Sequence, residues 1–108
     1  MVHQVKTSEE LEQLISQSKG KVLVIDYFST WCGPCVGFTP TFQKMSSEMP
    51  EVVFLKVDVD ECPEAADKAA IQSIPAFHVY ANGSKQEVVV GASETKLRDA
   101  IKKAKSKI

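Results

Sequence analysis

The feature that most constrains the fold is a pair of mostly apolar runs separated by a helical pattern. Residues 22–29 are apolar up to Ser29 with one interruption, Asp26, and residues 52–59 form a second such run. Runs of this kind are typical of strands that are covered on both faces, in the middle of a sheet. Between the runs, Phe38, Phe42 and Met45 recur at helical spacing. This order predicts two central strands of one sheet, connected by a helix.

The flanking segments complete an alternation of strands and helices. The predicted strands cover residues 2–5, 22–29, 52–59, 76–80 and 86–90, and the predicted helices cover about residues 8–19, 33–49, 60–71 and 93–104. The order β-α-β-α-β-α-β-β-α predicts an α/β fold, a three-layer α/β/α sandwich with a central mixed five-stranded sheet and four helices. A chain of 108 residues is expected to form a single domain, residues 1–108.

A pair of cysteines, Cys32 and Cys35, follows the first central run, where the next helix begins. Cysteines three residues apart on a first helical turn face the same way, so they can close a disulfide with little backbone movement. The N–H groups of a helix N-terminus favour the thiolate, which is the nucleophile of disulfide exchange. The pattern predicts a redox pair with an exposed Cys32 sulfur. The alternatives are two core thiols or half of a zinc site, but no second cysteine pair is present and no metal site is predicted.

Composition limits the function without naming it. A net charge of −1 gives no reason to expect a nucleic-acid or membrane partner, and no apolar stretch approaches the roughly 20 residues that span a bilayer. Three cysteines are too few for a disulfide scaffold, and no export signal is visible, so a cytoplasmic location is expected. The cationic side chains of the last helix are interpreted as a solvated face rather than a nucleic-acid site. These residues are Lys96, Arg98, Lys102, Lys103, Lys105 and Lys107.

The residues around the cysteines resemble the thioredoxin family, and the likeness covers nearly the whole chain. It depends on Trp31-Cys32-Gly33-Pro34-Cys35, Asp26, Pro40, Ile74-Pro75, Gly83 and Gly91. Residues 53–60 and the position of Cys62 further resemble eukaryotic cytosolic thioredoxins. Val36 and Gly37 depart from the pattern, because many thioredoxins carry a cationic residue directly after the second cysteine.

The resemblance implies reduction of protein disulfides, with no bound cofactor beyond the Cys32–Cys35 disulfide. Cys32 would attack a substrate disulfide and Cys35 would resolve the mixed disulfide. Electrons would come from NADPH through a thioredoxin reductase, and substrates would include peroxiredoxin or ribonucleotide reductase. The chain would act mainly as a monomer, with a cis peptide bond rather than a trans turn before Pro75. The implied docking surface for substrates consists of Trp31, Gly33, Pro34, Ile74, Pro75 and Gly91.

Asp26 is the second candidate for chemistry. A carboxylate inside a covered strand is costly to ionise, so its pKa is expected to rise. The family arrangement implies that Asp26 takes the Cys35 proton through water and later returns one to the leaving thiol. Lys56 on the neighbouring strand is expected to moderate this pKa. The alternative is a solvent-facing aspartate at a sheet edge.

Other candidates have two interpretations each. Trp31 is a platform beside the thiols or a packed aromatic, and Gly91 allows close approach of a substrate or simply ends a strand. Asp58 and Asp60 tune the local field or, in the favoured interpretation, are solvated carboxylates. Cys62 is a regulatory thiol or, more simply, a semi-buried structural thiol.

Two other functions stay open. The first is an oxidant or isomerase of the secretory pathway, against which the Cys-Gly-Pro-Cys sequence argues because a histidine-containing dipeptide is expected there. The second is a thioredoxin-like adaptor or chaperone subunit, in which the fold supplies only a binding surface. Disulfide reduction in an assay with a Cys32→Ser control separates these functions.

Overall fold

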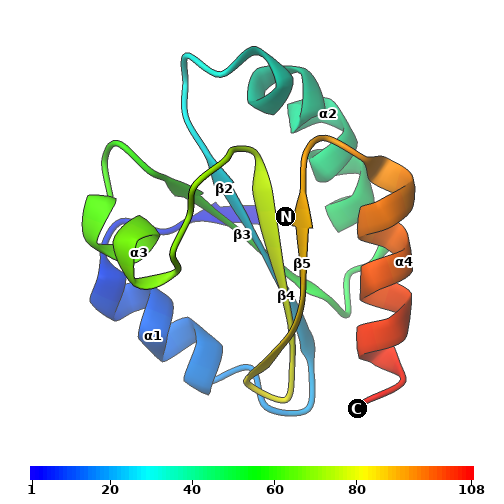
Figure 1. The fold of residues 1–108 in the computed structure, drawn as a ribbon. Coiled ribbons are helices and arrows are strands. Elements are labelled where there is room, and N and C mark those ends of the chain that lie inside the picture. Colours follow the sequence, from blue (N-terminus) through cyan, green and yellow to red (C-terminus); the bar gives the residue numbers. More distant parts are fainter.

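The computed structural model describes all 108 residues as a five-stranded sheet between two layers of helices (Figure 1). In chain order the elements are β1 (Val2–Gln4), α1 (Ser8–Ser16), β2 (Val22–Phe28), α2 (Gly33–Glu48), β3 (Val53–Asp58), α3 (Pro63–Lys68), β4 (Ala76–Ala81), β5 (Ser84–Val90) and α4 (Glu94–Lys105). The strand order is β1-β3-β2-β4-β5, with β1, β3 and β2 parallel and β4 and β5 antiparallel to their neighbours. The predicted three-layer α/β sandwich with a mixed sheet is therefore confirmed.

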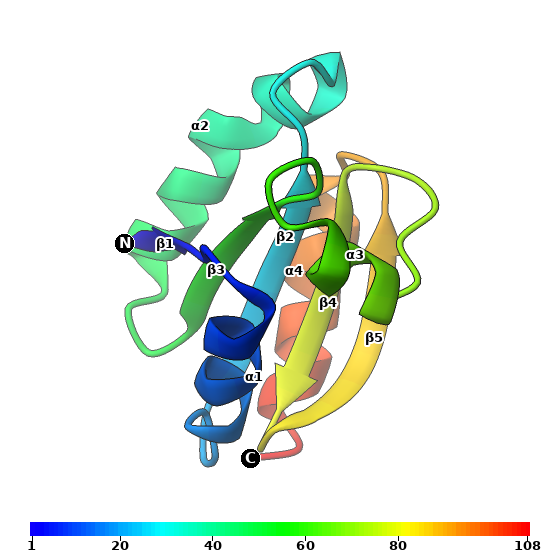
Figure 2. The same cartoon turned by 90° about the vertical axis from the view of Figure 1, so that its left-hand side faces the viewer.

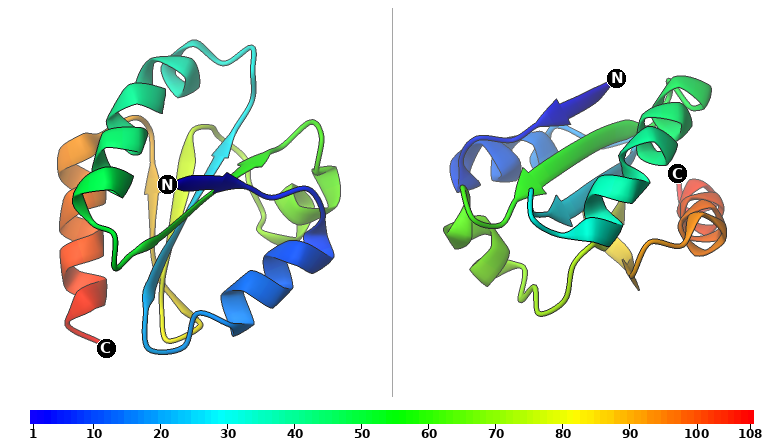
Figure 3. Two further views of the ribbon diagram at one scale, coloured as in Figure 1. Left: turned by 180° about the vertical axis from the view of Figure 1, so that it is seen from behind. Right: turned by 90° about the horizontal axis from the view of Figure 1, so that it is seen from above.

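The strand β2 lies in the middle of the sheet. It pairs with β3 on one side and β4 on the other, and six of its seven residues are buried. Helices α2 and α4 cover one face of the sheet, and α1 and α3 cover the other (Figures 1 and 3). A strand that is covered on both faces needs apolar side chains at successive positions, which explains the continuous run in the sequence.

Two hydrophobic cores fill the space between the layers. On one face, β2 contributes Val22 and Val24, and on the other it contributes Leu23, Ile25 and Tyr27, because successive side chains of a strand alternate. The first core is completed mainly by aromatic and aliphatic residues of α2 and α4, among them Phe38, Phe42, Met45, Leu97 and Ile101. The second is completed from α1, β3 and α3, among them Leu11, Leu55, Val57 and Ala65.

Short polar signals in the sequence fix several element ends. The Thr7 side chain accepts a hydrogen bond from the Glu10 N–H at 3.0 Å and begins α1, and Ser93 does the same for α4. Asn82 and Gly83 have φ of 55° and 79°, as the two-residue turn between β4 and β5 requires.

The structure differs from the predicted boundaries at the end of α1, where the helix stops at Ser16 rather than near residue 19, and around α3 and β5. The helix α3 begins at Pro63 rather than near residue 60, because the Asp58 carboxylate accepts the N–H groups of Asp60 and Glu61 and forms a turn there. It ends at Lys68 rather than Ile71, since Ala70 has a left-handed φ of 56° that stops a helix. The strand β5 begins two residues earlier than predicted, at Ser84.

Three connections meet at one end of the sheet. The β2–α2 connection, the segment that enters β4, and the β5–α4 connection lie together at the top of the view in Figure 1 and again in Figure 2. Because β2 is parallel to β3 and β4 runs the opposite way, the end of β2 lies beside the start of β4, where Tyr27 pairs with Ala76. The cysteines and Ile74-Pro75 are thereby brought to the same edge.

Candidate redox site

Cys32 and Cys35 are joined by a disulfide at the N-terminus of α2, with their Cα atoms 5.2 Å apart. Cys32 is the N-cap residue, and its Sγ accepts a hydrogen bond from the Cys35 N–H at 3.2 Å. Pro34 occupies the first helical turn, where the missing N–H removes no intrahelical hydrogen bond. The predicted exposure of the Cys32 sulfur is wrong for this disulfide state, because Cys32 is only 6% exposed and Cys35 only 4%.

The Ile74-Pro75 segment lies against the disulfide. The Ile74–Pro75 peptide bond is cis, and the Ile74 carbonyl oxygen is 3.9 Å from the Cys32 Sγ. Gly91 donates its N–H to the Pro75 carbonyl at 2.8 Å and has a φ of +98°, which favours glycine at this position. Pro75 itself is buried, whereas Ile74 is partly exposed. The backbone of Ile74, rather than the Pro75 ring, is therefore what this segment offers to a partner.

Trp31 is the large exposed residue of the site. Its side chain is 72% exposed, and its indole Nε1 donates a hydrogen bond to Asp60 Oδ2 at 2.8 Å. The structure therefore contradicts the packed-aromatic interpretation. Asp60 is exposed, as a solvated carboxylate should be, but it also orients the indole. Gly33 and Pro34 are exposed next to Trp31, and a Cβ at Gly33 would meet no atom within 4 Å.

Asp26 is buried on β2, with 7% of its surface exposed. Its neighbours in register are Lys56 on β3 and Phe77 on β4, so the sheet-edge interpretation is wrong. Burial raises the pKa of Asp26 to about 7, and the positive charge of Lys56 opposes that rise. Its Oδ1 atom has no hydrogen-bond partner. The group can therefore gain and lose a proton near neutral pH.

Asp58 and Cys62 are both buried and form hydrogen bonds with the backbone. Asp58 is buried, so the solvated-carboxylate interpretation is wrong for it, and its Oδ1 accepts backbone N–H groups that close the turn before α3. Cys62 is also buried, and its thiol donates to the Lys6 carbonyl at 3.0 Å. Burial, together with the negative charges of Glu61 and Asp58, raises the pKa of the Cys62 thiol. These contacts favour the structural interpretation of Cys62 over the regulatory one.

Sequence reasoning missed the burial of His78. This residue on β4 is only 3% exposed, and the centroid of its ring lies 5.0 Å from that of the Tyr27 ring. Its Nδ1 atom has no hydrogen-bond partner. The signal was its place within the apolar run of residues 76–81. Burial, with a smaller effect of Lys85, lowers the pKa of His78 to about 4.

Because the imidazole of His78 is buried, the free energy of unfolding depends on pH. Between about pH 6.5 and 4 the unfolded chain binds a proton at His78 that the folded protein does not bind, so the contribution of His78 to stability falls as pH falls through this window, by up to about 3 kcal/mol. His78→Leu is expected to remove this contribution, so the free energy of unfolding of the variant relative to the parent should rise by about that amount from pH 7 to pH 4, as urea unfolding at both pH values can measure. The prediction fails if the difference between variant and parent is the same at both pH values.

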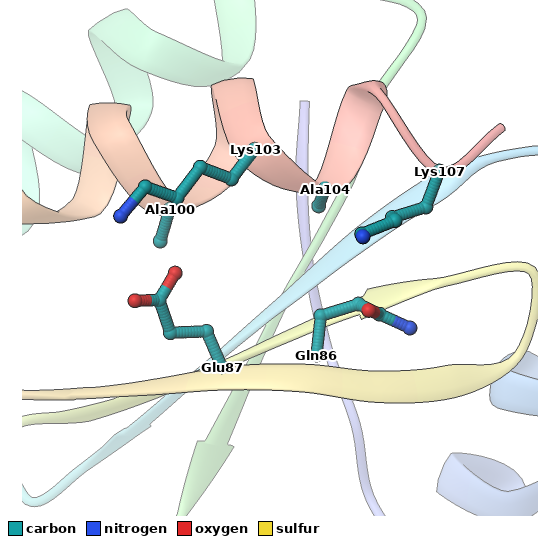
Figure 4. A pocket seen from close by; sticks show the side chains of 6 residues that line it. All are labelled: Gln86, Glu87, Ala100, Lys103, Ala104 and Lys107. Carbon is teal, nitrogen blue, oxygen red and sulfur yellow. The ribbon is translucent and has the colours of Figure 1, made fainter.

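The surface hollows lie away from the disulfide. One hollow of about 240 Å³ lies between β5 and α4, with Glu87 and Gln86 on one side and Lys103 and Lys107 on the other (Figure 4). Neither Cys32 nor Cys35 lines this or any other hollow. Small-molecule sites are usually concave, so a disulfide that lines no pocket is better suited to a macromolecular substrate. No cluster of three metal-ligating side chains is present, and none of the helices has the length and apolar character needed to cross a membrane.

Comparison with known proteins extends the likeness over almost the full chain. The profile of the family described as Thioredoxin matches residues 2–103. Thioredoxin-1 of Schizosaccharomyces pombe is 42% identical over 102 residues, which is 94% of this chain and 97% of that protein. Thioredoxin of Geodia cydonium is 42% identical over 106 residues, 97% of this chain and all of that protein.

Solved structures agree. The X-ray structure of Fasciola hepatica thioredoxin superposes with a TM-score of 0.91 at 40% identity, covering 94% of this chain and 98% of that one. Thioredoxins contain a Cys-x-x-Cys disulfide of the kind found here at the start of α2. With the fold, the disulfide and the sequence in agreement, the chain belongs to the thioredoxin family and is a thiol-disulfide oxidoreductase that reduces protein disulfides.

Proposed function

We propose that Cys32 is the attacking nucleophile and Cys35 the resolving thiol. In the reduced protein, the Cys35 N–H that Cys32 Sγ now accepts would stabilise a Cys32 thiolate. That thiolate attacks one substrate sulfur, and the other substrate sulfur leaves as a thiolate. Cys35 then attacks Cys32, which releases the second substrate thiol and forms the Cys32–Cys35 disulfide. Two electrons pass to the substrate, and the position of the disulfide at the helix N-terminus is the observation that carries this proposal.

Asp26 is proposed to serve the proton transfers of this reaction. When Cys35 attacks, it must lose a proton, and the leaving substrate thiolate must gain one. A carboxyl group with a pKa of about 7 is suited to both directions, because its two protonation states are nearly equal in energy at neutral pH. Its unpartnered Oδ1 is free to bond a water that relays the proton.

The docking surface is proposed to include Trp31, the Ile74 backbone and Gly91. Trp31 offers an exposed apolar face, and the Ile74 carbonyl lies beside Cys32. An extended substrate chain that pairs with this backbone is bound largely without regard to its sequence. Gly33 and Pro34 are exposed beside Cys32 and leave room for the backbone of a partner, whereas Pro75 is buried behind the Ile74 backbone. Asp60 contributes by orienting Trp31.

The cellular setting is proposed from the family. Electrons would come from NADPH through a thioredoxin reductase, and peroxiredoxin and ribonucleotide reductase are the substrate classes we favour. A solved structure with 33% identity to this chain concerns the resolution of a yeast mitochondrial 1-Cys peroxiredoxin through glutathione and thioredoxin systems. We place the protein in the reducing cytoplasm, where a free thiol such as the buried Cys62 stays reduced. We also propose that it acts mainly as a monomer of one domain.

Cys35→Ser tests the assignment of the two sulfurs. Cys32 would still attack, but no resolving thiol would follow, so a mixed disulfide between Cys32 and the substrate is expected to accumulate. The reduced variant is mixed with an oxidised protein substrate such as insulin and analysed on non-reducing gels and by mass spectrometry. Cys32→Ser should form no such adduct. An adduct through Cys62 in Cys35→Ser, or through Cys35 or Cys62 in Cys32→Ser, would overturn the assignment.

A further inference from the structure

The side chain of Lys56 does not make the contact that its place in the sheet predicts. Lys56 on β3 is the register partner of Asp26 on β2, and neighbouring strands lie about 4.8 Å apart. An ammonium group beside a buried carboxylate is expected to pair with it. Instead, Lys56 forms no ion pair with Asp26, and Asp26 Oδ1 has no partner at all.

The aromatic ring of Phe28 accounts for the position of the ammonium group. The Lys56 Nζ lies over the Phe28 ring, 5.4 Å from its centroid, within the range of a cation–π interaction. Phe28 follows Asp26 by two residues on β2, so both side chains project from the same face of the strand. Phe28 and Lys56 are half-buried, whereas Asp26 is buried. The ring therefore offers the ammonium group a partner that does not require its full dehydration.

We propose that Phe28 is a positioning residue, whose ring holds the Lys56 ammonium group away from Asp26 and so leaves the carboxyl group without a counter-ion. This inference rests on the proposed role of Asp26 in proton transfer. A counter-ion in direct contact would hold Asp26 in its ionised form, which has no proton to donate and, when tightly paired, accepts one poorly. Phe28 thus keeps the carboxyl group able to accept the Cys35 proton and to return a proton to the leaving substrate thiolate.

The other groups that face Asp26 leave Lys56 as the charge that matters. On β4 its register partner is Phe77, which does not ionise. The helices α2 and α4 cover this face with apolar core side chains, and Cys35 of α2 cannot titrate while it is in the disulfide. Lys56 is the one charged residue that shifts the pKa of Asp26, against the larger effect of burial. A small movement of its ammonium group would therefore be felt at the carboxyl group.

The test is a titration of the Asp26 carboxyl group in the oxidised protein, followed by NMR of aspartate-labelled chain. Phe28→Leu removes the ring but keeps an apolar side chain, and it is expected to lower the pKa of Asp26 by about one unit. Phe28→Trp keeps the cation–π interaction and serves as the matched control, with an unchanged titration expected. Lys56→Met is expected to raise the pKa of Asp26, because it removes the opposing charge.

The double variant Phe28→Leu with Lys56→Met decides whether the ring acts by holding the Lys56 ammonium group or only by keeping water away from Asp26. If the ring acts through the ammonium group, Phe28→Leu has no further effect once Lys56 is gone. An equal drop in both backgrounds, or no drop with Phe28→Leu alone, overturns the proposal. If Phe28→Leu perturbs folding, a shift in the Phe28→Trp titration still contradicts the proposal. The titration needs no turnover, so its result stays separate from any failure of the proposed proton transfer.

Discussion

Replacing Cys32 with serine is expected to abolish disulfide reduction, with a loss of more than about a thousandfold. A serine hydroxyl is not ionised near neutral pH and forms no disulfide, so neither the mixed disulfide nor the Cys32–Cys35 bond can form. The fold should be retained, because both cysteines contribute little volume and the serine oxygen can still accept the Cys35 N–H as an N-cap. Insulin reduction in the presence of dithiothreitol measures the effect.

Cys62→Ser is the matched control for this experiment. Cys62 is also a buried N-cap cysteine, but it belongs to α3 and donates to the Lys6 carbonyl, a bond that serine can keep. Its turnover should equal that of the parent protein. Full activity of Cys32→Ser with an intact circular dichroism spectrum would refute the nucleophile assignment. It would place the attacking sulfur at another residue.

Asp26→Asn is expected to have opposite effects on stability and on turnover. The pKa of Asp26 is about 7 in the folded protein against 3.8 for the ordinary carboxyl group. Between these values the folded protein holds a proton that the unfolded chain releases. The contribution of Asp26 to stability is therefore greatest below about pH 3.8 and is lost as pH rises to about 7, by up to about 4 kcal/mol. Asparagine never ionises, so the variant should be more stable by that amount at pH 8 and nearly unchanged at pH 4.

Turnover of Asp26→Asn should fall about tenfold to a hundredfold at neutral pH, since the carboxyl group no longer moves protons. Urea unfolding of the oxidised protein at both pH values, with insulin reduction between pH 6 and 9, measures the two effects. Between pH 4 and 6.5 the effects of Asp26 and His78 on stability oppose each other, so the variant should reveal the acid sensitivity of His78. Equal stability of variant and parent at pH 8, or unchanged turnover across the range, would contradict the prediction.

Much of the fold followed from local patterns. The apolar run of β2 required a central strand, and Asn82-Gly83 required a hairpin turn. The boundaries of α3 did not follow, because the burial of one nearby side chain decides where this helix begins. Asp58 caps the preceding turn with its buried carboxylate, and nothing in the local sequence distinguishes that carboxylate from a solvated one.

The residues of the site were also predictable, but their surroundings were not. Cys32, Cys35, Asp26 and the Ile74-Pro75 pair were visible as motifs. That Pro75 is buried while Trp31 is exposed depends on how three connections pack at one end of the sheet.

The sequence by itself determined the elements and the redox pair, since hydrophobic period and residue type act over a few positions, whereas the burial of Asp26 followed from the strand order. Only the tertiary structure decided which groups meet across strands. Lys56 and Phe28 are 28 residues apart in the chain, yet strand pairing brings the ammonium group over the ring. The electrostatic environment of Asp26 depends on such contacts between distant segments, because charge acts through space and not along the chain.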